Sequence, residues 1–193
     1  QMLFYLPLSG SAFKKVYYDE VMGRAVSKFV PADDLVVPYT ATSLDDAESI
    51  IHMVKMSENE LRKQQVGGFY RDIELDPSYN SESESQKKER ELDGTKKGRD
   101  EKVFTLLECH VNLDLDGFND VDAEGQPTGI KLPYIVTIEE GSREILSIRR
   151  NYEIGDPLKS KISYFVHFKF LPGLGFYGFG LIHMIGGLSR TAT

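Results

Sequence analysis

The sequence predicts an α+β domain in which antiparallel strands dominate and helices are few and short. Segments rich in Val, Ile, Phe and Tyr recur along the chain, and turn residues join several of them into hairpins. Clear helical patterns occur at residues 58–66 and from Phe179 onward. The 193 residues are 40% apolar, which is enough to form a core, so wholesale disorder is excluded.

The first predicted part of this domain covers residues 1–79. Four short segments have the composition of strands, and a turn that ends on Gly23 joins the first two as a hairpin. These strands are expected at residues 12–18, 24–30, 35–38 and 50–56. Residues 43–48 form a polar loop or a helical turn.

A helix is predicted directly after the last of these strands. Ser57 and Glu60 have the spacing of a capping box, in which each side chain satisfies a free backbone N–H at the helix start. The helix should run from Glu58 to about Val66 and end at Gly67-Gly68, where a left-handed residue can close it.

The composition changes over residues 80–101. The run SESESQKKERE contains no apolar residue and mixes both signs of charge. Such a segment cannot bury enough surface to offset the entropy lost on ordering. We expect a charged, mobile insertion or an exposed helix rather than a nucleic-acid arm or an interaction tail.

The second part of the same α+β region covers residues 102–193. Strands are predicted at 103–115, 132–140, 144–152 and 162–170, and the middle two form a hairpin about Gly141-Ser142. The last strand carries apolar residues on both faces, so we expect it to be covered on both sides. The helix from Phe179 carries Leu181, Ile182, Ile185 and Leu188 at three- and four-residue spacings, and we expect it to be truncated at the chain end.

Charge and cysteine content restrict the possible partners. The formal charge of −7 disfavours adsorption to DNA or to an anionic membrane through a broad basic field. No segment reaches the roughly 18 apolar residues of a membrane span, and residues 1–8 lack the basic start of a signal peptide. The single Cys109 cannot form an internal disulfide, which indicates a cytosolic folding compartment. We expect Cys109 to be a buried structural thiol.

No catalytic, cofactor-binding or metal-binding residue is predicted, and we expect the chain not to be an enzyme. Cys109 and His110 are adjacent on a strand and so point to opposite faces, which separates a thiol from its nearest base. The four histidines lie in separate apolar elements, without metal-ligand spacing between any two. They are His52, His110, His167 and His183.

An acidic stretch, DLDGFNDVD over residues 114–122, offers oxygen atoms at alternating positions, as a calcium loop does. Its Gly117 comes too early, and Glu124 does not take the place of the bidentate last ligand. We expect an acidic surface turn, with a calcium-dependent binding module as an alternative.

Residues 173–178 fit the dinucleotide-binding pattern G-x-G-x-x-G and lie between a strand and a helix. No Lys follows as in a P-loop, the preceding strands are predicted antiparallel, and Phe and Tyr separate the glycines. Tight packing against a neighbouring chain or element is the preferred interpretation. A nucleotide- or phosphate-binding enzyme that uses Gly173–Gly180 is the alternative function.

Four stretches cover most of the chain outside the charged segment. They are residues 6–18 (LPLSGSAFKKVYY), 29–39 (FVPADDLVVPY), 51–63 (IHMVKMSENELRK) and 170–183 (FLPGLGFYGFGLIH), the last continuing to residues 186–188 (GGL). These stretches resemble the portal (head–tail connector) proteins of tailed bacteriophages of the podovirus type, and the last of them is the strongest match.

The resemblance implies a structural role in the virion. Portal subunits assemble as a ring, typically of twelve copies, at one capsid vertex. The ring is the channel for DNA entry and exit, which the DNA passes without sequence-specific binding, and it joins head to tail. The chain would be a piece of the wing-type region; terminase, capsid and tail proteins would be partners of the full-length subunit.

The resemblance to portal proteins also has implications for the localisation of the chain and for its contacts with other subunits. The subunit would reside in the host cytoplasm during assembly and could be encoded by a prophage. Phe176, Tyr177 and Phe179 are the predicted subunit-contact residues, because ring subunits meet through heterologous, partly apolar interfaces.

Overall fold

The computed structural model describes residues 2–19, 23–75, 94, 103–122 and 124–191. This part of the chain divides into two compact units. Unit 1 comprises residues 1–52, 110–134 and 150–193, and unit 2 comprises residues 53–109 and 135–149. The predicted charged insertion lies outside the described residues except for Gly94, so its character stays a prediction.

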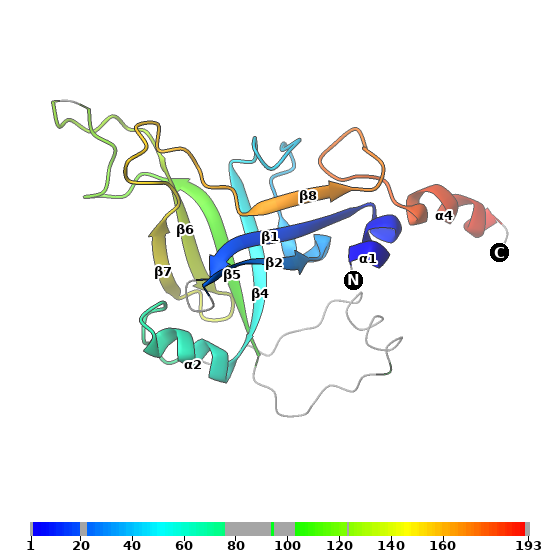
Figure 1. The fold of residues 1–193 in the computed structure, drawn as a ribbon, viewed down its shortest axis with the longest axis horizontal. Coiled ribbons are helices and arrows are strands. Elements are labelled where there is room, and N and C mark those ends of the chain that lie inside the picture. The colour runs from blue at the N-terminus through cyan, green and yellow to red at the C-terminus, as the bar shows by residue number, and fades with distance from the viewer. Residues whose placement is uncertain (1, 20–22, 76–93, 95–102, 123, 192–193) are drawn as a thin grey trace. The chain divides into compact units, whose positions relative to one another are not determined.

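A three-stranded antiparallel sheet organises unit 1 (Figure 1). Strands β1 (Ser11–Asp19) and β2 (Arg24–Val30) form the predicted hairpin, with Phe13 opposite Val30 and Asp19 opposite Arg24. Strand β8 (Phe165–Lys169) pairs with the other edge of β1, so the sheet order is β2-β1-β8. A segment near the C-terminus therefore completes the sheet that the N-terminal hairpin begins.

A second sheet has five strands in the order β3-β4-β5-β6-β7, and its strands contribute residues to both units. The prediction of an α+β fold with mostly antiparallel strands is confirmed. The bounds of these strands are β3 Leu35–Val36, β4 Ser49–Ser57, β5 Val103–Leu113, β6 Leu132–Glu139 and β7 Ile145–Arg150. A 3-10 turn, η1 (Ala32–Asp34), leads into β3.

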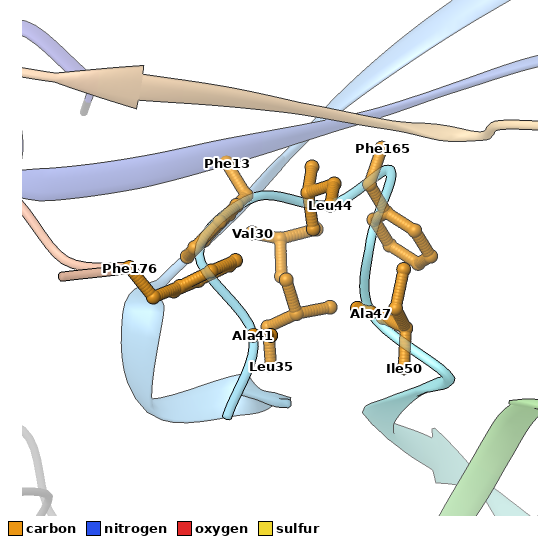
Figure 2. Close-up of a cluster of buried hydrophobic side chains, with 9 residues drawn as sticks. All are labelled: Phe13, Val30, Leu35, Ala41, Leu44, Ala47, Ile50, Phe165 and Phe176. Carbon is orange, nitrogen blue, oxygen red and sulfur yellow. The ribbon is translucent and has the colours of Figure 1, made fainter. Parts of the chain in front are cut away.

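The core of unit 1 is built from residues on β1, β2, β3, β4 and β8 and from the segments between strands (Figure 2). Phe13 is fully buried, and Phe165 and Phe176 are 4% and 7% exposed. The members of this cluster are Phe13, Val30, Leu35, Ala41, Leu44, Ala47, Ile50, Phe165 and Phe176.

Unit 2 is built around helix α2 (Glu58–Val66) and a smaller core of Leu61, Phe104, Leu106 and Leu146. The helix bounds are as predicted, the Ser57 hydroxyl accepts a hydrogen bond from Glu60 N (3.3 Å), and Gly68 takes the left-handed conformation (φ 73°) after the helix. Hairpin strands β6 and β7 are neighbours, as expected.

The prediction that the last strand is covered on both sides is wrong. Strand β8 spans only residues 165–169, and while Phe165 is buried, Val166 on the opposite face is 45% exposed. The reason is that one face of the three-stranded sheet rests on the core, whereas apolar residues on the other face meet solvent.

The two terminal helices depart from the sequence-based expectations in different ways. Helix α4 (Leu181–Thr191) begins two residues later than predicted. Helix α1 (Met2–Ser9) was not predicted; it contains Pro7, and Gly10 N donates to Leu6 O (2.9 Å) at its end. None of the described helices combines the length and apolar character that crossing a membrane requires.

Candidate interaction surface

The glycine-rich segment between β8 and α4 packs backbone to backbone against the end of α1. A Cβ atom on Gly178 would lie 2.5 Å from Gly10 O, and one on Gly180 would lie 2.3 Å from Leu8 O. Gly10 has φ of 86°, where L side chains are strained, and its own Cβ would lie 2.4 Å from Gly178 O. Glycine is therefore required on both sides of this crossing, which we call the glycine crossing (Gly10, Gly178 and Gly180).

Hydrogen bonds connect the glycine crossing to the three-stranded sheet. Gly178 N donates to Ser11 Oγ (2.8 Å), and Ser11 Oγ lies 3.1 Å from His167 Nε2. Ser11 is only 2% exposed. Because Ser11 is the first residue of β1 and His167 lies on β8, this network joins the loop to two strands.

The His167 ring stacks against two phenylalanine rings of the core. Its centroid is 4.4 Å from that of Phe13 and 4.8 Å from that of Phe176, with stacked geometry in both pairs. Burial, with a smaller contribution from the charge of Lys169, lowers the pKa of His167 from 6.5 to about 4. The imidazole is therefore neutral at physiological pH and serves in packing.

Three backbone donors at the C-terminal end of the glycine segment are engaged within the chain. Gly178 N is bound by Ser11, Gly180 N donates to His183 Nδ1 (3.1 Å), and Phe179 N donates to Leu171 O (2.8 Å). A phosphate-binding loop needs such N–H groups directed at the ligand. This geometry favours the packing interpretation of the glycines over the nucleotide-binding one.

The three predicted subunit-contact residues separate into two environments. Phe176 belongs to the chain's own core, stacked with Phe13 and His167. Tyr177 and Phe179 are 47% and 46% exposed. Phe176 therefore does not lie at the surface of the chain, whereas the contact role of Tyr177 and Phe179 stays a prediction.

The two terminal helices bring further apolar side chains to the surface beside this segment. Helix α1 packs against α4 and β1, yet none of its residues is buried (Figure 1). We define the α1–α4 surface by its exposed apolar residues Leu3, Phe4, Leu8, Leu174, Tyr177, Phe179, Leu181, Ile182, Met184 and Ile185. Large exposed apolar surfaces mark interaction sites, so the exposed apolar residues of these neighbouring elements make them a candidate interaction site.

The N-terminal half of the α1–α4 surface was missed at the sequence level. Residues 2–8 carry no charged or strongly polar side chain, so this part of the helix has no polar face. Pro7 argued against a helix here, because proline is disfavoured inside helices. A short helix that is apolar on all sides must be buried by something. This uniform apolar character is the signal that could have identified it.

The acidic stretch 114–122 forms turns held by its own side chains. Asn119 Nδ2 donates to Asp114 Oδ1 (2.8 Å), and Asp122 Oδ1 accepts from Glu124 N and Gln126 N (2.9 Å each). Asp120 pairs with Lys159. Within the described ranges, no three His, Cys, Asp or Glu side chains come together as a metal site would require.

The remaining histidines and Cys109 lie in packed surroundings. His52 and His110 both form T-shaped contacts with the Phe165 ring, with centroid distances of 5.4 and 5.2 Å. Cys109 is half-buried rather than buried, which corrects the sequence-based expectation; burial and the nearby Glu108 raise the pKa of its thiol. A thiol with a raised pKa is a poor nucleophile.

An open pocket of about 350 Å³ in unit 1 is lined by residues 45–48 and 130–133 and by Asn112, Leu158, Lys159 and Lys161. Two of its three lysines make contacts within the chain: Lys161 Nζ donates to Leu44 O (3.1 Å) and Ala47 O (3.3 Å), and Lys159 pairs with Asp120.

Comparison with known proteins adds no family assignment. The sequence matches no protein-family model and no curated protein.

Proposed function

We propose that the chain is part of a portal subunit of a tailed bacteriophage and acts through assembly into a ring. The observation that carries this proposal is the α1–α4 surface. It offers apolar side chains that the described part of the chain leaves exposed, and assembly would bury them.

The positions in the fold of the stretches that resemble portal proteins support the proposal. Residues 6–18 and 170–183 are two of those stretches, and both contribute to the glycine crossing. The glycine crossing positions α1 beside the start of α4. The two stretches that resemble portal proteins therefore help to form the α1–α4 surface.

The charge of the chain is compatible with a channel. A net charge of −7 disfavours retention of DNA on the protein, and DNA must move through the ring in both directions. Terminase, capsid and tail proteins would be bound by the complete subunit, in the virion at a capsid vertex.

Electron microscopy of the complete subunit tests the proposal. We expect rings for the wild type, and loss of rings when Tyr177 and Phe179 are both replaced by Ser, because exposed aromatic residues dominate many interfaces. Replacing Tyr39 and Ile154, which are 105% and 83% exposed outside this surface, provides the matched control and should leave rings intact. Wild-type subunits that stay monomeric under assembly conditions would refute the proposal.

A thermal-shift experiment distinguishes assembly from nucleotide binding. Because the N–H groups of Gly178 and Gly180 are already bonded within the chain, we expect no measurable rise in Tm with ATP and Mg²⁺. A ligand at 100 times its Kd would stabilise the fold by about 2.7 kcal/mol, so a true site would produce a clear shift.

A further inference from the structure

Two backbone N–H groups of the glycine crossing are connected to histidine side chains. Gly178 N donates to the Ser11 hydroxyl, which lies 3.1 Å from His167 Nε2. Gly180 N donates directly to His183 Nδ1, also at 3.1 Å. Burial in the core lowers the pKa of His167 to about 4, whereas His183 is exposed on α4. One of the two glycine donors is therefore satisfied by a side chain that solvent can reach.

The contact between Gly180 and His183 has the form of one half of a capping box. Gly180 directly precedes α4 and accepts a hydrogen bond from Met184 N (3.3 Å), so His183 is the third residue of the helix. In a capping box the side chain at this position accepts a hydrogen bond from the N–H of the residue before the helix, a role that Glu or Gln usually fills. His183 Nδ1 fills this role at the start of α4.

The hydrogen bond to His183 is important because Gly180 is buried. A Cβ atom on Gly180 would lie 2.3 Å from Leu8 O and 2.5 Å from Gly10 N, so its backbone is packed tightly against the end of α1. A buried N–H that loses its acceptor is destabilising, since water does not replace the lost bond. The start of α4 and the glycine crossing therefore both depend on the acceptor that His183 provides.

Only the neutral imidazole of His183 can be this acceptor. A protonated histidine carries an N–H on both ring nitrogens and accepts no hydrogen bond. Its positive charge would also lie at the N-terminal end of α4, where the helix dipole is positive. Histidine is the side chain that ordinarily changes its charge between about pH 5 and 8. Mild acidification would therefore remove the acceptor of Gly180 N.

The other groups on the elements around His183 titrate outside this range. Helix α1, which packs against α4, carries Tyr5. The loop before α4 carries Tyr177, whose pKa is raised by burial and by the charge of Asp33. Helix α4 itself carries Arg190. Tyrosine, aspartic acid and arginine ordinarily change charge outside the range from about pH 5.5 to 8, so a transition within it points to His183.

We infer that His183 is a proton-sensitive switch that stabilises the start of α4 when it is neutral and releases it when it is protonated. The start of α4 carries four residues of the α1–α4 surface, namely Leu181, Ile182, Met184 and Ile185. The consequence for assembly rests on the proposed function: rings form more readily at neutral pH than at mildly acidic pH.

Ring formation by the complete subunit, measured from about pH 8 to 5.5, tests this consequence. As the pH falls, the wild-type concentration at half-assembly should rise roughly five-fold, which is the typical effect of losing a helix cap. His183→Gln keeps an acceptor that cannot titrate, so this variant should assemble equally well at both ends of the range. His183→Ala has no acceptor and should be weakened roughly five-fold at both ends.

Two outcomes of the assembly experiment would overturn the inference. Wild-type rings that form equally well at both pH values would show that protonation of His183 does not reach the α1–α4 surface. An unchanged pH dependence in His183→Gln would show that a different group is responsible.

Hydrogen exchange of the complete subunit, below the concentration at which rings form, tests the switch independently of assembly. Peptides covering residues 178–185 should exchange faster in the wild type than in His183→Gln at about pH 5.5, and equally fast at about pH 8. Comparison at one pH cancels the intrinsic pH dependence of exchange. Equal exchange at both pH values would overturn the inference and leave the proposed function standing. Absence of wild-type rings at every pH would instead refute the proposed function, and exchange would still decide whether the switch exists.

Discussion

The two units of the chain are stabilised in different ways. In unit 1 the decisive contacts join segments far apart in sequence: Ser11 bonds Gly178 N and His167, and Gly10 meets Gly178 backbone to backbone. Unit 2 also has contacts between distant segments, such as the hydrogen bond from Arg71 N to Leu146 O (2.8 Å), but the start of its helix α2 is determined locally by the Ser57 cap.

This difference predicts how the two units respond to mutation. Residues of unit 1 share partners, so removing one of them disturbs several contacts, and mutational effects should be large and non-additive. Local features of unit 2 can be removed singly, at a cost close to that of the one interaction lost.

The largest effect is expected for Phe13→Ala. Phe13 is fully buried and stacks on His167 and Phe176, so its removal leaves a cavity in the unit 1 core. We expect a loss of about 4 kcal/mol in the free energy of unfolding, measured by urea denaturation. Phe4→Ala is the matched control, because Phe4 is 71% exposed; its effect should stay within about 0.5 kcal/mol. Equal effects would contradict the assigned core.

A second large effect is expected at the glycine crossing. The added methyl group of Gly178→Ala would lie 2.5 Å from Gly10 O and 2.8 Å from Leu171 O, and backbone atoms must move to admit it. Such overpacking should cost about 3 kcal/mol in urea denaturation. Gly175→Ala, in the same loop, meets nothing within 4 Å and should be close to neutral. A neutral Gly178→Ala would mean that α1 and the loop do not cross as described.

The same contrast explains how much of the fold could be predicted. The bounds of helix α2 could be predicted because the residues that determine them, Ser57 at its start and Gly67-Gly68 at its end, directly flank the helix in the sequence. The hairpin of β1 and β2 was likewise predicted from turn residues. The pairing of β8 with β1 could not be predicted, because partners distant in sequence leave no local pattern.

The candidate site was predicted only in part for a related reason. Phe176, Tyr177 and Phe179 lie in a loop without helical or strand periodicity, so no pattern indicated that Phe176 points into the core while the other two are exposed. The glycines, by contrast, indicated close backbone packing, and that interpretation agrees with the glycine crossing.

A pH effect of intermediate size should distinguish unit 1. The pKa of His167 is about 4 in the fold and about 6.5 when unfolded, so between these values the unfolded state binds the proton first. Stability should therefore fall as the pH drops from about 6.5 to 4, by on the order of 2 kcal/mol after allowance for solvent screening. Denaturation at a series of pH values measures the slope.

His167→Gln is the control for this slope, because glutamine cannot titrate but can still hydrogen-bond Ser11. The variant should lose most of the dependence in this window. Asp46, Asp120 and Asp156 have lowered pKa values, so the loss of stability that they cause falls mainly below about pH 4, whereas that of His167 falls mainly above it. A slope retained in the glutamine variant would assign it to another group.

The smallest effect tests the local character of unit 2. In Ser57→Ala the backbone N–H of Glu60 loses its side-chain acceptor at the start of α2, which should cost about 1 kcal/mol in urea denaturation. Ser57→Asp keeps an acceptor at the cap and adds a negative charge near the positive end of the helix dipole, so it should retain or exceed wild-type stability. A loss well above 2 kcal/mol in the alanine variant would show that the cap is coupled to other contacts, as the residues of unit 1 are. The contrast between the interlocked contacts of unit 1 and the locally determined start of α2 would then no longer hold.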